Sequence, residues 1–386
     1  MRIKSFEVSG LLGRKKPLRL DFHEDINILT GRNGAGKTSV LKLIWYIISG
    51  NILLALQEVN FQKVTIETDE YTCTVVRTGK ATCRVEMSIG ESSRTFEDER
   101  DEDGDIFINA EDGANPVLMK IGRSVFLPTF RRIEGGFSLT TSSSRPGIGT
   151  GMFGNALLRP AREKNDVEDG LTELARKLTN KSHLFITAIS TVDISSILLK
   201  TYTDLSELYN SQQRSMSQEI VETIRGRQPT QDGGSDLQEA NELLDSIRQK
   251  IEQVELNRTF IMAPIEAIQS TVTTMFKHSG IKFNERLSFG DAALAVNSDS
   301  LSAGEKQMLS FISYNGLYED AVFLIDEPEL SLHVDWQRQL FPTLIRQQSS
   351  NQFIMATHSP FIYGKYPDKE LQIDPDRGDT EAELHG

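Results

Sequence analysis

The fold is decided by one stretch of sequence, Gly31-Arg32-Asn33-Gly34-Ala35-Gly36-Lys37-Thr38, which satisfies the pattern G-x-x-x-x-G-K-[ST]. Residues 25–30 before it alternate like a strand, and apolar residues recur at helical spacing after it, from Val40 to Ile48. Glycines let the backbone approach phosphate groups, and the N-terminus of the following helix attracts their charge. Because strand, glycine-rich loop and helix occur in this order, the sequence predicts a nucleotide-binding P-loop on an α/β fold.

The predicted P-loop assigns a contact to its last two residues. Lys37 is expected to reach the β- and γ-phosphates, and the Thr38 hydroxyl is expected to hold Mg²⁺. ATP and Mg²⁺ are therefore the expected cofactors. The residues expected to bind ATP in this stretch are Arg32, Asn33, Gly34, Ala35, Gly36, Lys37, Thr38 and Ser39.

A second motif places two adjacent carboxylates after an apolar run. Residues 321–325 are apolar throughout, as in a strand buried on both faces, and Asp326 and Glu327 follow directly. Open α/β sheets bind ligands at this end of their strands, where carboxylates can meet a cation and water. We expect Asp326 to bind Mg²⁺ and Glu327 to be the general base that activates the attacking water. Taken alone, the motif also fits an acidic turn at a strand edge.

The third motif is Leu301-Ser302-Ala303-Gly304-Glu305, which opens a predicted helix. A helix N-terminus offers free N–H groups and the positive end of a dipole to an anion, so Ser302, Gly304 and Glu305 are candidate ATP-binding residues. Taken alone, a serine with a glutamate three residues later is an ordinary capping box. The position of the motif, shortly before the two carboxylates, favours the binding role.

A fourth motif, Met355-Ala356-Thr357-His358-Ser359-Pro360, places a histidine after another strand-like segment, residues 352–356. His358 is expected to donate a hydrogen bond to the γ-phosphate or to position the water. It is the second candidate catalytic residue, after Glu327. A neutral histidine of the core is the alternative for this position.

The composition limits the class of protein. The 386 residues include 42 Lys plus Arg and 55 Asp plus Glu, a formal charge of −13, which argues against a wholly electrostatic nucleic-acid binder. The longest apolar stretch, residues 40–56, is interrupted by Lys42 and by Ser49-Gly50-Asn51, so no membrane association is expected. The N-terminus lacks the apolar region of a signal peptide, and we expect a cytoplasmic protein.

The periodicity changes along the chain and predicts three parts. Residues 1–137 read as an N-terminal lobe with the P-loop and an antiparallel β-subdomain. Residues 138–285 read as a loop and a helical insertion that forms a short antiparallel coiled-coil hairpin, and residues 286–386 as a C-terminal α/β lobe with the other motifs. The predicted seam of the second hairpin helix is Leu237, Ala240, Leu244, Ile247, Ile251 and Val254.

These four motifs, in this order, resemble those of ABC-type ATPases, and the large insertion resembles the SMC, RecF and OLD branch. Within that branch the sequence is similar to compact AAA-type ATPases of bacterial antiphage systems such as Septu, PARIS and some retrons, and residues 126–134 look like a segment common among them. The resemblance implies an ABC-type head whose signature, Leu301 to Glu305, acts across a homodimer or higher homo-oligomer. It also carries the Mg²⁺ ligands over to Thr38 and Asp326, the base to Glu327 and the switch histidine to His358.

The sequence departs from the family pattern in two places. The Q-loop glutamine of the family has early candidates in Gln57 and Gln62, and none near Arg131. The sequence also ends soon after His358, with no room for the TOPRIM nuclease domain that OLD-type proteins carry. A nuclease or toxin would then be a separate polypeptide.

The leading functional hypothesis is an ATP-hydrolysing dimeric switch that controls a separate effector, a nuclease or toxin, in antiphage defence. The alternative is a DNA-repair or chromosome clamp of RecF or SMC type, with nucleic acid as a partner. Its phosphate contacts would come from Lys15, Lys16, Arg131 and Arg132. A transporter motor fits the motifs and not the insertion, and a non-catalytic version would use ATP only to hold two chains together.

Overall fold

The computed structural model describes residues 1–100, 106–129, 132–133, 173–180, 182–189, 191–225, 236–275, 302–347 and 349–373. The chain divides into two compact units. Unit 1 consists of Met1–Ser190, Ser302–Phe311 and Tyr318–Gly386, and unit 2 consists of Thr191–Leu301 and Ile312–Leu317.

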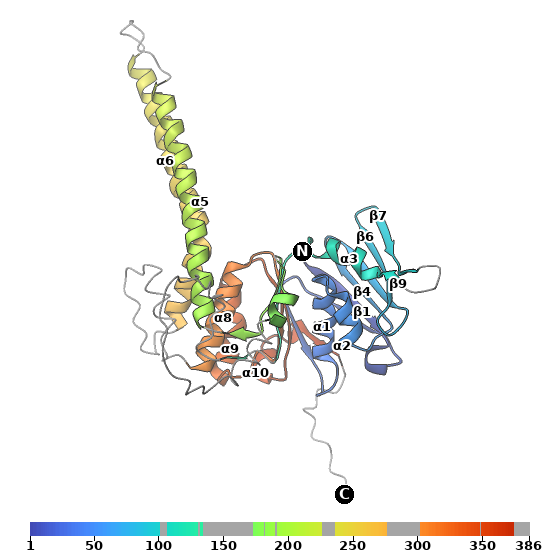
Figure 1. Cartoon of the computed structure of the whole chain (residues 1–386). Coiled ribbons are helices and arrows are strands. Elements are labelled where there is room, and N and C mark those ends of the chain that lie inside the picture. The colour runs from blue at the N-terminus through green and yellow to red at the C-terminus, as the bar shows by residue number, and fades with distance from the viewer. Residues whose placement is uncertain are drawn as a thin grey trace, which may run out of the picture. The chain divides into compact units, whose positions relative to one another are not determined.

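Sheet A of unit 1 is six-stranded and antiparallel, in the order β2-β1-β4-β5-β6-β7. Its strands alternate buried and exposed residues, as in β4, because one face lies on the core and the other on solvent. The helix α3 (Ala110–Leu118) packs against β6 and β7 (Figure 1). This sheet is the antiparallel β-subdomain that the sequence predicts. Its strands are β1 (Ile3–Ser9), β2 (Leu18–Asp21), β4 (Lys63–Thr68), β5 (Thr72–Arg77), β6 (Cys83–Ile89) and β7 (Ser92–Phe96).

Sheet B of unit 1 is also six-stranded, and all its strands run parallel, in the order β12-β10-β14-β15-β3-β16. The carboxyl ends of all six strands therefore lie at one edge of the sheet. The central strands β14 and β15 are buried along their whole length, which explains their continuous apolar sequences. The strands are β3 (Ile26–Thr30), β10 (Ser124–Leu127), β12 (His183–Phe185), β14 (Val322–Asp326), β15 (Gln352–Ala356) and β16 (Glu370–Gln372).

The helix after the P-loop, α1 (Lys37–Ile48), lies in the centre of the core. Its residues 43–48 are all buried, and one apolar cluster joins them to residues of both sheets. A helix that is apolar all round is stable only when it is buried on every side. On this helix Trp45 stacks on Phe126 of β10, with 5.6 Å between ring centroids, and contacts Phe185 of β12 at 5.1 Å.

Shorter elements complete unit 1. Two further helices are α8, which begins within the signature, and α9, which comes after the Asp326–Glu327 pair. Residues 303–311 of α8 belong to unit 1 and residues 312–317 to unit 2. Two-residue and three-residue strands form the small pairs β8 with β9 and β11 with β13. The elements are η1 (Leu11–Gly13), α2 (Ile52–Glu58), β8 (Glu99–Arg100), β9 (Ile106–Ile108), β11 (Arg132–Ile133), β13 (Ala188–Ile189), α8 (Ala303–Leu317), α9 (Val334–Arg346), α10 (Pro360–Tyr363) and η2 (Pro367–Lys369).

Unit 2 contains the predicted hairpin, formed by α5 (Thr191–Arg225) and α6 (Asp236–Met275), which run side by side (Figure 1). Lys250 of α6 forms an ion pair with Glu219 of α5 at 3.4 Å. The predicted seam is wrong at two positions, because Leu244 is 62% exposed and Ile251 is 51% exposed. Ile247 and Val254 are half-buried. The side chains of Leu237 and Ala240 lie outside the described residues.

The boundary of the insertion also differs from the expected residue 138. His183–Phe185 forms β12, which pairs with β10 at the edge of sheet B, and Ala188–Ile189 forms β13. Unit 1 therefore continues to Ser190, and the hairpin begins with α5. The helical periodicity of this region does not predict these two short strands, because they form only through pairing with the distant strands β10 and β11. Among the described residues, no helix is long and apolar enough to span a membrane.

A buried histidine in sheet B predicts how the stability of the protein changes in acid. His183 is fully buried, and its Nδ1 lies 2.8 Å from the Ser124 hydroxyl. Burial lowers the pKa of His183 from 6.5 to about 4, so between these values the unfolded chain binds a proton that the folded chain does not. Stability that is present above pH 6.5 is lost as the pH falls toward 4. We expect a loss of roughly 3 kcal/mol, measured by urea unfolding across this range.

His183→Asn should flatten this part of the profile, because asparagine does not titrate. His333→Gln is the matched control at an exposed histidine and should keep the wild-type slope. If the free energy of unfolding of His183→Asn fell with pH as steeply as that of wild type, other groups would cause the loss of stability in acid.

Candidate nucleotide and metal site

The P-loop has the backbone that its glycines permit. Gly34 has φ 80° and Gly36 has φ 94°, both in the left-handed region. The loop is held from outside by Arg14, which donates to the Ala35 carbonyl at 2.7 Å and to the Ile373 carbonyl at 3.2 Å. No sequence pattern predicts a role for Arg14, because only the fold brings it to the P-loop.

Lys37 at the start of α1 is buried, and its ammonium group points back into the loop. It donates to the carbonyls of Gly31 at 2.9 Å and Arg32 at 3.3 Å. Its Nζ also lies 2.5 Å from His358 Nε2. A protonated lysine can only donate in this contact, and it would pair with the His358 tautomer whose Nε2 carries no proton. Burial lowers the pKa of Lys37, and the nearby carboxylate of Glu327 opposes that shift.

Asp326 ends β14 as a fully buried carboxylate between two hydroxyl groups. Thr38 donates to its Oδ1 at 3.2 Å, and Thr129, just beyond the end of β10, donates to its Oδ2. Hard oxygen donors of this kind, one carboxylate with hydroxyls, are the set that Mg²⁺ prefers. The residues present therefore fit the ion that the P-loop pattern implies.

Glu327 follows Asp326 in a strained turn. Its φ is 48°, in the left-handed region that non-glycine residues rarely adopt, and its N–H donates to the Ala356 carbonyl of β15 at 2.9 Å. The carboxylate Oε1 lies 3.5 Å from His358 Nε2. Burial, followed by the neighbouring charge of Glu329, raises the pKa of Glu327 to about 8. A nearby cation lowers such a pKa, so Mg²⁺ would favour the ionised form that a general base requires.

These groups surround a hollow of about 230 Å³ at the edge of sheet B. The hollow brings together the P-loop, Glu327 and His358, as the expected site requires. The P-loop lies some 300 positions before the other two residues in the sequence. Arg32, Ala35 and Asp326 do not line the hollow, although Asp326 lies beneath it. The lining residues are Leu12, Asn33, Gly34, Gly36, Lys37, Thr38, Ser39, Glu327 and His358.

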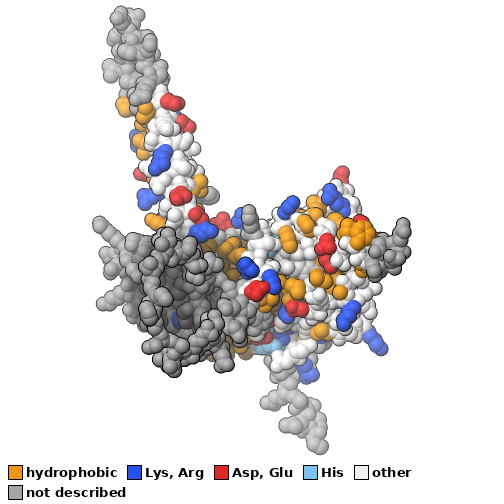
Figure 2. Space-filling model, viewed as in Figure 1, with side chains coloured by type: hydrophobic (Ala, Val, Ile, Leu, Met, Phe, Trp, Pro, Cys, Tyr) orange, Lys and Arg blue, Asp and Glu red, His pale blue; other side chains and the backbone are white. Residues whose placement is uncertain are grey.

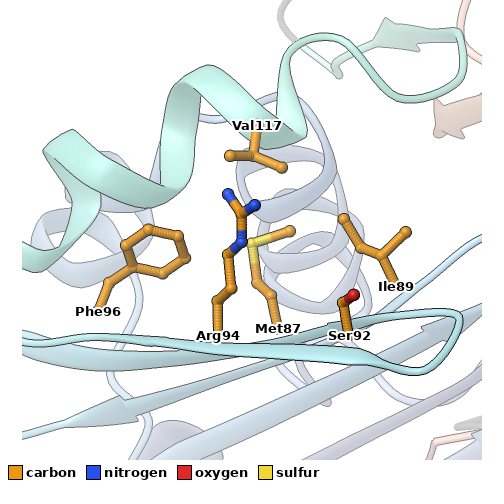
Figure 3. Close-up of a pocket in the computed structure, with 6 residues that line it drawn as sticks. All are labelled: Met87, Ile89, Ser92, Arg94, Phe96 and Val117. Carbon is orange, nitrogen blue, oxygen red and sulfur yellow. The ribbon is translucent and has the colours of Figure 1, made fainter.

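A second hollow, of about 330 Å³, lies over sheet A between α3 and the strands β6 and β7. Figure 3 shows Arg94 reaching toward Val117 between apolar side chains. Arg94 is the one charged residue of its lining, and no carboxylate is present among the lining residues. This hollow therefore lacks the groups needed for phosphate and Mg²⁺ chemistry. Its lining residues are Met87, Ile89, Ser92, Arg94, Phe96 and Val117.

The signature forms the N-terminus of α8 as a reciprocal capping box. Ser302 N–H donates to Glu305 Oε2 at 2.8 Å, and Glu305 N–H donates to Ser302 Oγ at 3.3 Å. A Cβ on Gly304 would lie 2.6 Å from the Ser331 carbonyl oxygen, so glycine allows close packing on the turn after β14. The three candidate residues of this motif do not line the hollow of their own chain.

The signature helix and the acidic turn are also joined by Gln307. Its side-chain amide donates to the Pro328 carbonyl at 2.9 Å, in a fully buried position. Neither glutamine expected for the Q-loop, Gln57 or Gln62, lines the hollow. Thr129 reaches Asp326 instead. The sequence offers no signal for Thr129 or Gln307, because both act through partners that are remote along the chain.

Two protein-family models match the chain. One, described as "AAA domain", matches residues 2–259. The other, described as "AAA domain, putative AbiEii toxin, Type IV TA system", matches residues 170–363.

Two curated proteins are similar over short segments. Endonuclease GajA of Bacillus cereus (strain VD045) is 43% identical over 63 residues, which are 15% of this chain and 11% of that protein. Retron Ec83 probable ATPase of Escherichia coli is 38% identical over 75 residues, which are 16% of this chain and 14% of that protein. The chain thus matches only a small part of the length of either relative.

Solved structures of remote sequence are also similar. The Smc head domain with an extended coiled coil, bound to the C-terminal domain of ScpA and derived from Pyrococcus furiosus, has a TM-score of 0.37 at 12% identity, with 94% of this chain and 91% of that chain covered. The recombination mediator protein RecF has a TM-score of 0.33 at 12% identity, with 93% of each chain covered.

The close packing of Gly304 generates a prediction. Gly304→Ala should destabilise unit 1 by about 1–3 kcal/mol, because the added methyl group meets a backbone oxygen that cannot move alone. Thermal or urea unfolding measures the loss. Ala303→Ser, at the exposed neighbouring position, is the matched control and should stay within about 0.5 kcal/mol of wild type. Equal stability of Gly304→Ala and wild type would contradict the packing described here.

Proposed function

The chain belongs to the AAA-domain family of ATPases, and from this premise we propose that it binds and hydrolyses ATP as a dimeric switch that controls a separate effector protein. One observation carries the proposal. Lys37 of the P-loop, Glu327 and His358 line one hollow, and Asp326 accepts a hydrogen bond from Thr38, which also lines it, although separate segments of the sequence supply these groups.

Each group has a place in phosphoryl transfer. The P-loop N–H groups and Lys37 bind the β- and γ-phosphates, and Thr38 and Asp326 hold Mg²⁺. When bound, Mg²⁺ supplies positive charge to the phosphate oxygens. Glu327 orients the attacking water and takes its proton. His358 lies against both Glu327 and Lys37, so it can hold the water or the γ-phosphate in line.

The contact between Lys37 and His358 gives the switch its first step. The γ-phosphate is a stronger acceptor for a lysine ammonium group than a neutral imidazole, because the interaction is charge-assisted. Binding of ATP would therefore replace His358 by phosphate as the partner of Lys37. His358 would then turn its ring to the phosphate or the water. The nucleotide would thus be sensed by the loop that follows β15.

A second chain would complete the site. Ser302 is exposed at the N-terminus of α8, where free N–H groups and the helix dipole favour an anion. It does not line the hollow of its own chain. We therefore assign the signature to the ATP bound by a second copy, so that two ATP molecules are held between two P-loops and two signatures. Such a dimer would form with ATP and separate after hydrolysis.

The hairpin of unit 2 supports a protein partner. Leu208, Leu244, Ile251 and Leu256 are exposed on α5 and α6, and Figure 2 shows hydrophobic side chains along this hairpin. These side chains offer apolar surface that a protein partner could cover. One matching family is described as a putative toxin of a type IV system, and the similar proteins are named an endonuclease and a retron ATPase. We propose a nuclease or toxin as the effector, in antiphage defence.

Glu327→Gln tests the proposal. The variant should bind ATP and turn it over at least about 100-fold more slowly, because the amide cannot accept the proton of the water. It should therefore remain dimeric with ATP and Mg²⁺ in sedimentation experiments, whereas wild type returns to its nucleotide-free state. Lys37→Ala, which cannot hold the phosphates, should stay in that nucleotide-free state throughout. Unchanged ATP turnover in Glu327→Gln would refute the role of Glu327.

The same variants identify the partner. The Glu327→Gln chain, purified with ATP from the native host, should bring down a nuclease or toxin, and Lys37→Ala should not. Recovery of the ATPase without a partner from both variants would contradict the effector proposal. ATP-dependent and salt-sensitive binding of a DNA duplex by the purified wild type would point to the repair-clamp alternative.

A further inference from the structure

Glu329 is an acidic residue of the site to which the motifs assign no role. It lies in the turn after β14, two residues beyond Glu327, and its Oε1 accepts the backbone N–H of His358 at 2.7 Å. It also lies beside Glu327, whose pKa it helps to raise. Glu329 is thus the side chain that joins the acidic turn to the loop carrying the histidine.

The second oxygen of Glu329 makes this arrangement costly. Oε2 is buried and has no hydrogen-bond partner among the described residues. A half-buried carboxylate with one buried oxygen that lacks a hydrogen-bond partner, next to a second carboxylate, lowers stability. A glutamine could accept the same N–H without the charge. Costs of this kind concentrate at functional sites, where geometry matters more than stability.

The rest of the histidine loop is held without Glu329. Ser359 N–H donates to Thr357 Oγ1 at 3.0 Å, and the Ser359 hydroxyl donates to Gln337 Oε1 at 2.6 Å. Thr357 N–H donates to the Leu29 carbonyl at 3.2 Å. These contacts fix the loop on both sides of His358. The bond from Glu329 fixes the backbone N–H of the histidine itself.

We propose that Glu329 is a positioning residue for hydrolysis, which holds the backbone of His358 so that its ring stands between Lys37 and Glu327. With the backbone fixed, only the two side-chain torsions of His358 remain free. The ring can then turn from Lys37 toward phosphate or water without moving away from Glu327. Glu329 does not line the hollow, and it acts through His358.

The first test observes the contact itself and needs no ATP hydrolysis. The chain contains six histidines, so ¹⁵N-histidine labelling gives at most six backbone amide signals, and His358→Gln identifies the relevant one. An N–H bonded to a carboxylate resonates at low field. Glu329→Ala should move this signal upfield, and Glu329→Gln should move it less. Ser359→Ala, which removes two hydroxyl contacts of the same loop, with Gln337 and with the Phe361 N–H, should move it much less than Glu329→Ala does. An unmoved signal in Glu329→Ala would overturn the proposal.

The second test measures the kinetic role, which rests on the proposed ATP hydrolysis. Glu329→Ala should lower kcat about 10-fold and leave KM for ATP nearly unchanged, because the phosphate-binding loop is intact. Glu329→Gln should keep most of the rate, because its carbonyl oxygen still accepts the N–H. In a His358→Ala background, Glu329→Ala should cause no further loss, since two residues that act as one unit are not additive.

The outcomes separate the two proposals. A wild type that hydrolyses no ATP contradicts the proposed function, and the amide signal still decides the contact. A wild type that hydrolyses ATP, with losses that multiply in the double variant, contradicts positioning through His358. A Glu329→Gln variant as slow as Glu329→Ala contradicts it as well, because a lost charge and not a lost acceptor would then set the rate.

Discussion

The parallel register of sheet B is the constraint on which the rest of the structure depends. Leu29, Ala356 and Asp326 are neighbours on adjacent strands β3, β15 and β14. The P-loop comes after β3, His358 after β15 and Glu327 after β14. Because the ends of these strands are aligned, the three segments lie next to one another at the same edge of the sheet. A slip of one residue in β14 would turn Asp326 to the other face. The buried helix α1 holds this register, because it packs on β10, β14 and β15.

The site contains several groups whose burial or backbone conformation costs free energy. Lys37 and Asp326 are buried, Glu327 has a left-handed backbone, and Glu329 has an unsatisfied oxygen. Burial and the adjacent carboxylates raise the pKa of Glu327 to about 8. A bound cation would compensate the carboxylates of such a site, and a bound phosphate would compensate its lysine, so both would stabilise the folded state. Nucleotide binding would therefore also tighten unit 1.

The sequence predicts the parts of the site that lie within one segment. Residues 31–38, the Asp326–Glu327 pair and His358 follow from local patterns, because a strand, a turn and a helix start each leave a signature in a few residues. Contacts between segments leave none. Thr129 and Glu329 reach their partners only after β10, β14 and β15 have paired.

The hairpin shows a further limit of sequence patterns. Its spacing predicts a seam at Leu244 and Ile251, which are exposed. Lys250 of α6 forms an ion pair with Glu219 of α5, and Ile247 and Val254 of the predicted seam are half-buried. Apolar residues spaced three and four positions apart predict a helix face that can be buried. They do not predict which other element covers that face.

The central claim is that the P-loop of one chain and the signature of another form one site. Its most direct test mixes Lys37→Ala and Ser302→Arg chains, each inactive alone, under subunit exchange. A shared site predicts recovery of about a quarter of wild-type ATP turnover, because half of the dimers then contain one intact site of two. Lys37→Ala mixed with Glu327→Gln should recover nothing, since both changes lie in the pocket of one chain. No recovery with Ser302→Arg would contradict the account.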